Sequence, residues 1–117
     1  MNILIILGLL LLNNPKEFKS NEIFKIDDIE CSYLRKISRL SCHGSKRTVF
    51  FNMSSFPKVR DLVVSRNDIT EIPEHTFQEY SQLRRLLITH NHVENVYLNC
   101  FDGLKFLNEL NLQNNKI

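Results

Sequence analysis

Apolar positions in the second half of the chain recur with a period of 24 residues. The segments that begin at Val59, Leu83 and Leu107 superimpose, and each reads L-x-x-L-x-L-x-x-N-x-I with aliphatic substitutions. Within each L-x-L, the two apolar residues lie two apart, so an extended strand directs both to one face and the residue between them to the other. Self-similarity at this period is typical of stacked repeats. We therefore expect one strand in each segment, and we expect these strands to stack between repeats.

The second half of each repeat also carries matched apolar positions. Three residues correspond in order between the two complete repeats, namely Ile72, Phe77 and Tyr80 with Val96, Phe101 and Leu104. We expect the two phenylalanines to fill the space between the sheet and the opposite wall of the repeat. Ile72 and Val96 then begin the return path along that wall. One repeat alone cannot close a core, so each depends on its neighbours for burial.

This set of matched positions resembles the leucine-rich-repeat family, in its 24-residue extracellular subtype with a phenylalanine late in each repeat. The resemblance covers about residues 37–117. It implies an α/β solenoid, here a leucine-rich-repeat horseshoe fragment with a parallel concave β-sheet and a mostly irregular convex side. It also implies a role in binding other proteins, and it identifies no particular ligand.

One asparagine stands in each repeat where the chain turns out of its strand: Asn67, Asn91 and Asn115. Backbone groups at such a turn have no sheet partner, whereas a side-chain amide can donate twice and accept twice. A stacked column of these amides can therefore satisfy backbone groups in successive repeats. We interpret the three asparagines as a structural ladder and not as ligand-binding residues.

A shorter and weaker copy of the motif precedes the regular repeats by 22 residues, with Ser45 in place of the ladder asparagine. Its positions Ile37, Leu40 and Cys42 match Val59, Leu62 and Val64. We expect a first strand over about residues 37–42, in an atypical terminal repeat that shields the core. Cys31 lies eleven residues before Cys42. In an exported protein this pair indicates a disulfide that closes an N-terminal cap, and it resembles the cysteine-bearing caps of extracellular repeat proteins.

Cys100 is the remaining cysteine, and an unpaired thiol in an exported chain raises the alternative of a reactive or intermolecular group. Cys100 matches Thr76, immediately before the core phenylalanine, where a small and mostly buried side chain fits. Free cysteine packs as a small hydrophobic residue. We therefore expect Cys100 to be a reduced core residue.

The chain starts with an apolar stretch of ten residues, from Ile3 to Leu12, followed at once by polar residues. A transmembrane helix needs about 20 residues, whereas the apolar part of a signal peptide has about 7 to 15. We predict a signal peptide over residues 1–20, with a retained membrane anchor or a buried first helix as the alternatives. Export would place the protein outside the cell or on the extracellular face of the plasma membrane.

These boundaries predict the domain organisation of the chain. After the signal peptide come a cap with an atypical first repeat (residues 21–58), two repeats (59–82 and 83–106) and a truncated repeat (107–117). Because the last segment covers only part of a repeat, we expect a longer receptor or secreted repeat protein. Membrane association is then expected only through a region beyond Ile117 or through a retained N-terminal anchor.

Composition and motifs argue against several classes of function. The formal net charge is +2 at pH 7 and the 15 Lys and Arg residues are scattered, so there is no general electrostatic reason to bind nucleic acid. The triplet His90-Asn91-His92 has no cysteine or carboxylate beside it at metal-ligand spacing. The sequence also has no nucleophile-elbow motif and no phosphate-binding glycine loop. We predict neither an enzyme nor a cofactor or metal site.

The outward-facing residues of the strands are the candidate binding face, because leucine-rich-repeat proteins commonly bind other proteins on the concave sheet. The apolar pair Val63 and Leu87 marks its centre, although these aliphatic side chains could instead simply cover one another. Within this face, Asp61, Arg85 and Glu109 form a column of alternating charge across three adjacent strands. We assign this column to strand register and surface solubility before ligand binding. The face comprises Asp61, Val63, Ser65, Arg66, Arg84, Arg85, Leu87, Thr89, His90, Glu109, Asn111 and Gln113.

The leading hypothesis is an extracellular protein-recognition module, such as the ectodomain of a Toll-like or adhesion receptor, with protein ligands on the concave face. A secreted matrix or structural repeat protein is one alternative. An intracellular regulatory scaffold is another, if the N-terminus is not a signal. Asn52 begins the one N-x-S/T sequon and is a candidate glycosylation site, although alignment by 24 residues gives it the half-buried place of Thr76.

Overall fold

The computed structural model describes residues 23–26, 29–50 and 58–117 of the chain. The predicted signal peptide and the Asn52 sequon lie outside these residues. The described strands are β1 (Ile23–Ile26), β2 (Ile29–Leu34), β3 (Arg39–His43), β4 (Asp61–Ser65), β5 (Glu71–Ile72), β6 (Arg85–Leu87), β7 (Asn95–Val96) and β8 (Glu109–Asn111). A short 3-10 helix, η1 (Arg35–Ile37), joins β2 to β3.

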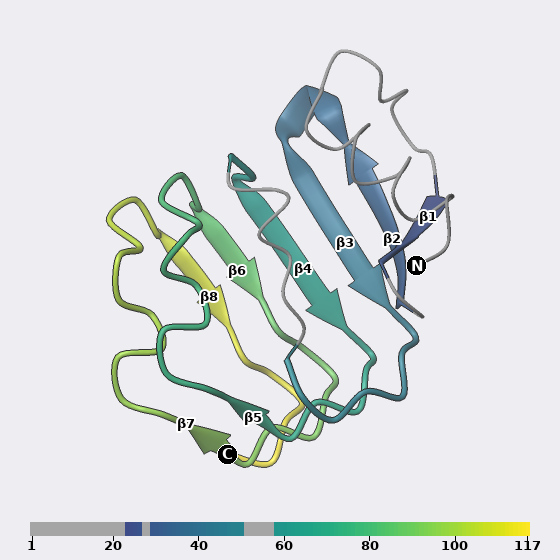
Figure 1. Ribbon diagram of the computed structural model, residues 1–117, viewed down its shortest axis with the longest axis vertical. Coiled ribbons are helices and arrows are strands. Elements are labelled where there is room, and N and C mark those ends of the chain that lie inside the picture. Colours follow the sequence, from purple (N-terminus) through teal and green to yellow (C-terminus); the bar gives the residue numbers. More distant parts are fainter. Residues whose placement is uncertain (1–22, 27–28, 51–57) are drawn as a thin grey trace.

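Six of the strands form one sheet in the order β1-β2-β3-β4-β6-β8 (Figure 1). Strands β3, β4, β6 and β8 are parallel, which confirms the predicted parallel sheet. Their inward leucines are in register, because Leu62 pairs with Leu40 on one side and with Leu86 on the other. At the N-terminal edge β1 and β2 run antiparallel to their neighbours. Equivalent positions of successive repeats therefore lie side by side in the sheet.

The core lies directly behind the parallel strands. Inward residues of the central strands, Leu62 and Val64 in β4 and Leu86 in β6, have no exposed surface. Leu110 of β8, the last strand in the sheet, is 43% exposed. Neighbouring repeats thus provide the burial that no single repeat can provide.

Opposite the sheet, the described chain forms turns and a small second sheet but no α-helix, so the expected α/β class is corrected to a solenoid of strands and turns. Strands β5 and β7 pair in parallel, and Val49 extends them by one bridge to Glu71. Between β5 and β6, turns close by N–H donation from Tyr80 to Phe77 and from Leu83 to Tyr80, each at 3.0 Å. Such isolated turns are too short to propagate as an α-helix.

Phenylalanine side chains fill the space between the two walls. The ring of Phe77 is fully buried and lies parallel to that of Phe101, with centroids 5.9 Å apart. On its other side, Phe50 meets it edge-on at 5.1 Å. Phe50 was not among the residues that the repeat pattern matched, so the sequence analysis missed its contribution.

The first parallel strand begins later than the sequence pattern predicts. We expected a strand over residues 37–42, but Ile37 lies in η1 and is 44% exposed, whereas its match Val59 is 2% exposed. The chain turns at Ser38, which adopts a left-handed conformation with φ of 54°. The 22-residue offset holds from the next residue, because Arg39 pairs with Asp61. The turn removes Ile37 from the core while leaving the strand register intact.

The predicted disulfide between Cys31 and Cys42 is present and joins β2 to β3. The two cysteines are direct cross-strand partners, with Cα atoms 4.1 Å apart, and both are buried. Closing a loop of eleven residues stabilises the fold by about 3 kcal/mol through loop-closure entropy. Cys100 is a free cysteine with 1% exposure, and its burial raises the pKa of the thiol.

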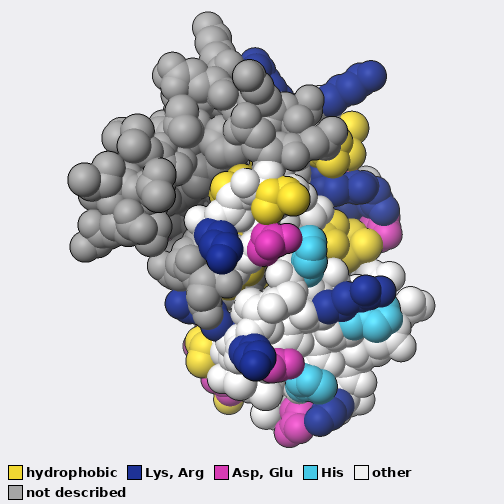
Figure 2. Space-filling view, turned by 90° about the vertical axis from the view of Figure 1, so that its right-hand side faces the viewer, with side chains coloured by type: hydrophobic (Ala, Val, Ile, Leu, Met, Phe, Trp, Pro, Cys, Tyr) yellow, Lys and Arg dark blue, Asp and Glu magenta, His cyan; other side chains and the backbone are white. Residues whose placement is uncertain are grey.

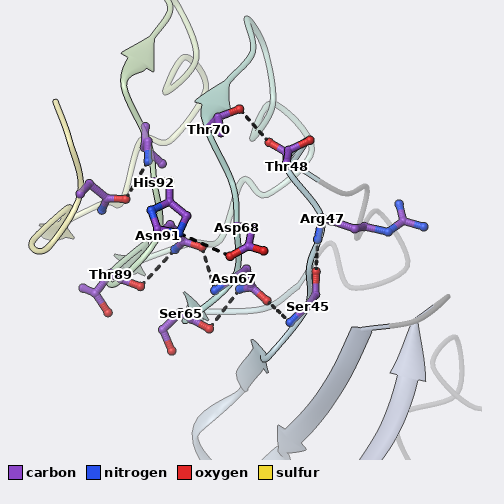
Figure 3. A network of polar contacts seen from close by, with 12 residues as sticks. Ser45, Arg47, Thr48, Ser65, Asn67, Asp68, Thr70, Thr89, Asn91 and His92 are labelled. Carbon is purple, nitrogen blue, oxygen red and sulfur yellow. Dashed lines mark hydrogen bonds and ion pairs between the residues drawn. The ribbon is translucent and has the colours of Figure 1, made fainter.

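The asparagine side chains connect the turns that follow successive strands (Figure 3). Asn67 Oδ1 accepts the Ser45 N–H at 2.9 Å, and Asn91 Oδ1 accepts the Asn67 N–H at 3.0 Å. Asn91 Nδ2 donates to the Val64 carbonyl at 2.9 Å. Asn115 Nδ2 repeats this donation, to the Ile88 carbonyl at 2.7 Å, whereas its Oδ1 accepts the Val93 N–H at 3.1 Å, two residues beyond the equivalent donor. Each amide therefore satisfies backbone groups of the repeat before its own.

A left-handed residue stands immediately before every position of this column. The four residues are Gly44, Arg66, His90 and Asn114, with φ of 77°, 56°, 55° and 59°. This conformation turns the chain out of the strand so that the following side chain enters the core. Glycine adopts it without steric cost, whereas most other residues lose about 1 to 2 kcal/mol. Arg66 and His90 are both exposed, so their side chains project from the turn into solvent.

The ladder predicts a specific loss of stability when one amide is removed. Changing Asn91 to Ala leaves the Asn67 N–H and the Val64 C=O without their partners in a buried place, and should lower the free energy of unfolding by about 1 to 3 kcal/mol. Urea denaturation followed by circular dichroism measures this change. Asn108→Ala, at an exposed position, is the matched control. Equal losses in the two variants would contradict a structural ladder.

Candidate functional site

The candidate site is the outer sheet face, which we define as the solvent-facing side chains of β3, β4, β6 and β8 and of the turns that follow them. Backbone register arranges these side chains in columns across the strands. The first column is Arg39, Asp61, Arg85 and Glu109; the second is Ser41, Val63, Leu87 and Asn111; the third starts with His43 and Ser65. Thr89 and Gln113 follow β6 and β8 at the positions equivalent to Ser65.

The first column is a chain of ion pairs. Arg85 donates from Nε to Glu109 Oε2 at 2.6 Å and from Nη2 to Oε1 at 3.3 Å, while its Nη1 lies 3.5 Å from Asp61 Oδ2. Arg39 Nη2 lies 3.1 Å from the same Asp61 oxygen. The hydrogen bond from Arg85 lowers the pKa of Glu109 and likewise raises the pKa of Arg85. Two cations and two carboxylates thus neutralise one another.

Two details of this column differ from the sequence interpretation. Asp61, predicted as a surface residue, is only 9% exposed, because it lies between two arginines. Arg39 was not among the predicted residues, although it precedes Asp61 by the same 22 residues that relate the first two strands. The predicted columns contained only residues of the three regular repeats, so the outward position next to Leu40 was omitted.

An apolar centre follows the charged column. Val63 and Leu87 are cross-strand partners, and both are half-buried. Ser41 and Asn111 lie on either side of them in the same column. The pair therefore offers a small apolar area bounded by uncharged polar groups.

The two arginines and the histidine of the predicted face divide between the two ends of the strands. Arg66 follows β4 and His90 follows β6, at the carboxyl ends. Arg84 precedes β6, at the opposite end, where its carbonyl accepts the Asn108 N–H at 2.8 Å. His90 Nε2 lies 3.1 Å from Asn114 Nδ2. Among the described residues, the Arg66 side chain has no hydrogen bond or ion pair.

The three residues of the His90-Asn91-His92 triplet have separate partners. Asn91 is buried in the ladder, whereas His92 Nε2 lies 3.4 Å from Asp68 Oδ1 (Figure 3). Within the residues that the structure describes, no group of three or more His, Cys, Asp or Glu side chains could hold a metal ion. The same part of the chain contains no helix long and apolar enough to cross a membrane.

Arg85 connects both acidic residues of the column, and this predicts an effect that depends on salt. Changing Arg85 to Glu places three carboxylates on adjacent strands, so the variant should melt at a lower temperature than the parent, with a smaller difference at high salt. Thermal melts at 20 mM and 500 mM NaCl test this. Arg84→Glu makes the same charge change at an exposed neighbour. If both variants melt alike at low salt, the column does not stabilise strand register.

Comparisons with known proteins agree with this architecture. A search of curated proteins finds no match. Among solved structures, the crystal structure of the TLR13-ssRNA13 complex superimposes with a TM-score of 0.52 and 30% sequence identity, over 54% of this chain and only 9% of that one. A family model described as "Leucine rich repeat" matches residues 57–117, which is more than half of the chain. The chain therefore belongs to the leucine-rich-repeat family.

Proposed function

We propose that this protein is an extracellular protein-recognition module whose outer sheet face is the concave binding face of a leucine-rich-repeat horseshoe. The observation that carries the proposal is the apolar pair Val63 and Leu87, which faces outward on adjacent strands and is surrounded by polar side chains. Protein interfaces combine an apolar centre with a polar rim in this way.

The backbone beneath this face is rigidly held, which favours binding. Strands β3, β4 and β6 are each hydrogen-bonded to a neighbouring strand on both sides. The amides of the asparagine ladder hold the turns that follow. A partner that binds here would not have to order the backbone of the face, so less of the contact energy is lost. Rigid presentation of many side chains along one sheet supports recognition of a protein surface.

We also infer that the antiparallel strands β1 and β2, linked to β3 by the disulfide, form the N-terminal cap. They cover the edge that β3 would otherwise expose, where unpaired backbone groups could recruit another chain. The proposed domain boundaries follow: residues 21–58 for the cap and atypical first repeat, then repeats that begin at residues 59, 83 and 107.

The proposed role is binding and not catalysis. Asp61 and Glu109 are the carboxylates of the outer face on β4 and β8, and both are committed to arginines. Cys100, the free thiol among the described residues, is buried with a raised pKa and is therefore a poor nucleophile. Membership of a repeat family built for extended contact surfaces supports the same inference.

A protein partner fits this chain better than a nucleic acid. TLR13 was crystallised with ssRNA13, and that ligand belongs to TLR13. Here the formal net charge is +2, and on the face shown in Figure 2 the Lys and Arg side chains lie singly among acidic and histidine side chains. Binding along a phosphate backbone normally uses a continuous basic groove. A secreted matrix role, or an intracellular scaffold, remains the alternative class.

Export is the part of the proposal that the buried disulfide and the apolar N-terminus support, since disulfides persist mainly in oxidising compartments. Expressed in animal cells, the full chain should be recovered from the culture medium without about its first 20 residues. Mass spectrometry should then show Cys31 bonded to Cys42 and Cys100 labelled by a thiol reagent only after denaturation. Retention of the intact chain in the cytosol, with all three thiols reduced, would favour the intracellular alternative.

Recognition through the outer face is tested with a random 12-residue peptide library displayed on phage and selected on the full chain. Most selected peptides should lose binding to Leu87→Asp, because a carboxylate in the apolar centre must be desolvated on contact. They should keep binding to Leu98→Asp, the same change at a residue that follows β7 and is 80% exposed. Unchanged melting temperatures control for folding. Peptides that are insensitive to Leu87→Asp would refute this face as the binding site.

A further inference from the structure

We propose that the outer sheet face selects an acidic protein segment, in which a carboxylate side chain stands about two residues from an aliphatic one. The inference rests on the proposed recognition function and specifies the chemistry of the partner. It assigns the aliphatic side chain to Val63 and Leu87, and the carboxylate to the turn residues Arg66 and His90.

The first step is a charge inventory of the face. The column at the amino ends of the strands is closed, because Asp61 is held between Arg39 and Arg85, and Glu109 is bound by Arg85 through two hydrogen bonds. These groups sum to no net charge, and Arg85 uses Nε, Nη1 and Nη2 in its contacts with the two carboxylates. A charged partner would have to displace existing ion pairs there, so the column offers little attraction for either sign.

The second step concerns the opposite ends of the strands. Arg66 is exposed, and among the described residues its guanidinium has neither a carboxylate nor a hydrogen-bond partner. His90, at the equivalent place one repeat later, is also exposed, and its ring nitrogen Nε2 lies 3.1 Å from the Asn114 amide nitrogen. Arg66 therefore adds a positive charge at this end of the face that has no carboxylate partner among the described residues.

The third step is the position of Arg66 relative to the apolar centre. Side chains on one face of a strand are two residues apart, which is about 7 Å, and Arg66 comes directly after Ser65, the next outward residue beyond Val63. The left-handed conformation of Arg66 keeps its side chain outside the core. An extended segment along the strands can thus place one side chain on the apolar pair and another against the guanidinium.

The carboxylate is the anion that best fits these contacts. A guanidinium binds a carboxylate through two parallel hydrogen bonds, and contact with the adjacent apolar pair excludes water that would weaken them. Polyanions such as nucleic acid would bring several phosphates to a face with one unpaired arginine at this end. The apolar pair would then remain against a charged backbone, which gives a protein segment the advantage.

The test uses the peptides selected on the full chain at pH 7.4 and 50 mM NaCl. The peptides that lose binding to Leu87→Asp should be enriched for Asp or Glu two residues from Leu, Ile, Val or Met. Synthetic copies should bind Arg66→Glu at least 10-fold more weakly than the parent, and 500 mM NaCl should weaken parental binding. Arg60→Glu, the same change at an exposed residue before β4, should alter binding less than two-fold.

Two further variants keep the outcome interpretable. Arg66→Gly removes the guanidinium while suiting the left-handed backbone, so it should weaken peptide binding without lowering the melting temperature. Replacing the acidic residue of a bound peptide by its amide should abolish the difference between the parent and Arg66→Gly.

The possible outcomes separate the two proposals. Peptides that lose binding to Leu87→Asp but have no acidic preference, or bind Arg66→Glu normally, would overturn the acidic-segment inference and leave recognition through the face intact. The acidic-segment inference would also be overturned if a 20-nucleotide oligouridine displaced the peptides, bound as tightly as they do, and lost affinity when Arg66 is changed. Peptides insensitive to Leu87→Asp would instead remove the proposed function itself.

Discussion

The hydrogen bonds between each ladder asparagine and the preceding repeat are the constraint on which the rest of the structure depends. The turns that follow β4 and β6 direct Asn67 and Asn91 into the core, where backbone groups are shielded from water. Asn67 and Asn91 satisfy such groups with buried side-chain amides. Without these bonds, burial of such a tight turn would leave backbone N–H and C=O groups without hydrogen-bond partners. The period of the sequence is therefore a period of hydrogen bonding as much as of hydrophobic packing.

The same turn links stability to the proposed binding face. To direct the asparagine inward, the residue before it adopts a left-handed conformation, and the side chain of that residue is left in solvent at the end of the strand. Arg66 and His90 occupy these places where Gly44 occupies the equivalent one. Glycine would suit the backbone better, so the larger residues adopt this conformation at an energetic cost. This cost is consistent with a role for their side chains outside the core.

Sequence periodicity predicted the interior of this protein better than its surface. The register of Leu40, Leu62 and Leu86 follows from the offsets between repeats, because alternation determines which face of a strand a residue occupies. The disulfide was predicted differently, from two cysteines in the cap of an exported chain. Predictions failed in the atypical first repeat: Ile37 lies in η1 and outside the core, and Phe50, which the pattern did not match, packs on Phe77.

Surface contacts were harder to predict because they depend on the reach of long side chains. Strand alternation placed Asp61, Arg85 and Glu109 in one column, but it could not show that Arg39 also reaches Asp61 and covers it. The two short strands of the opposite wall, β5 and β7, were likewise beyond a pattern of apolar residues, since each has only two residues. Their pairing arises from stacking of the repeats and not from a local strand signal.

The division between inward and outward residues explains how such a sheet could acquire specificity without losing its fold. Core leucines and ladder asparagines fix the strands, so outward residues can change with small effects on stability as long as their charges remain compatible across strands. On this face the charges of the first column neutralise one another, and in the described part of the chain Arg66, near the apolar centre, has no carboxylate partner. Discrimination between partners then depends on the carboxyl ends of the strands, because that is where a wrong charge on the partner would meet an unneutralised one.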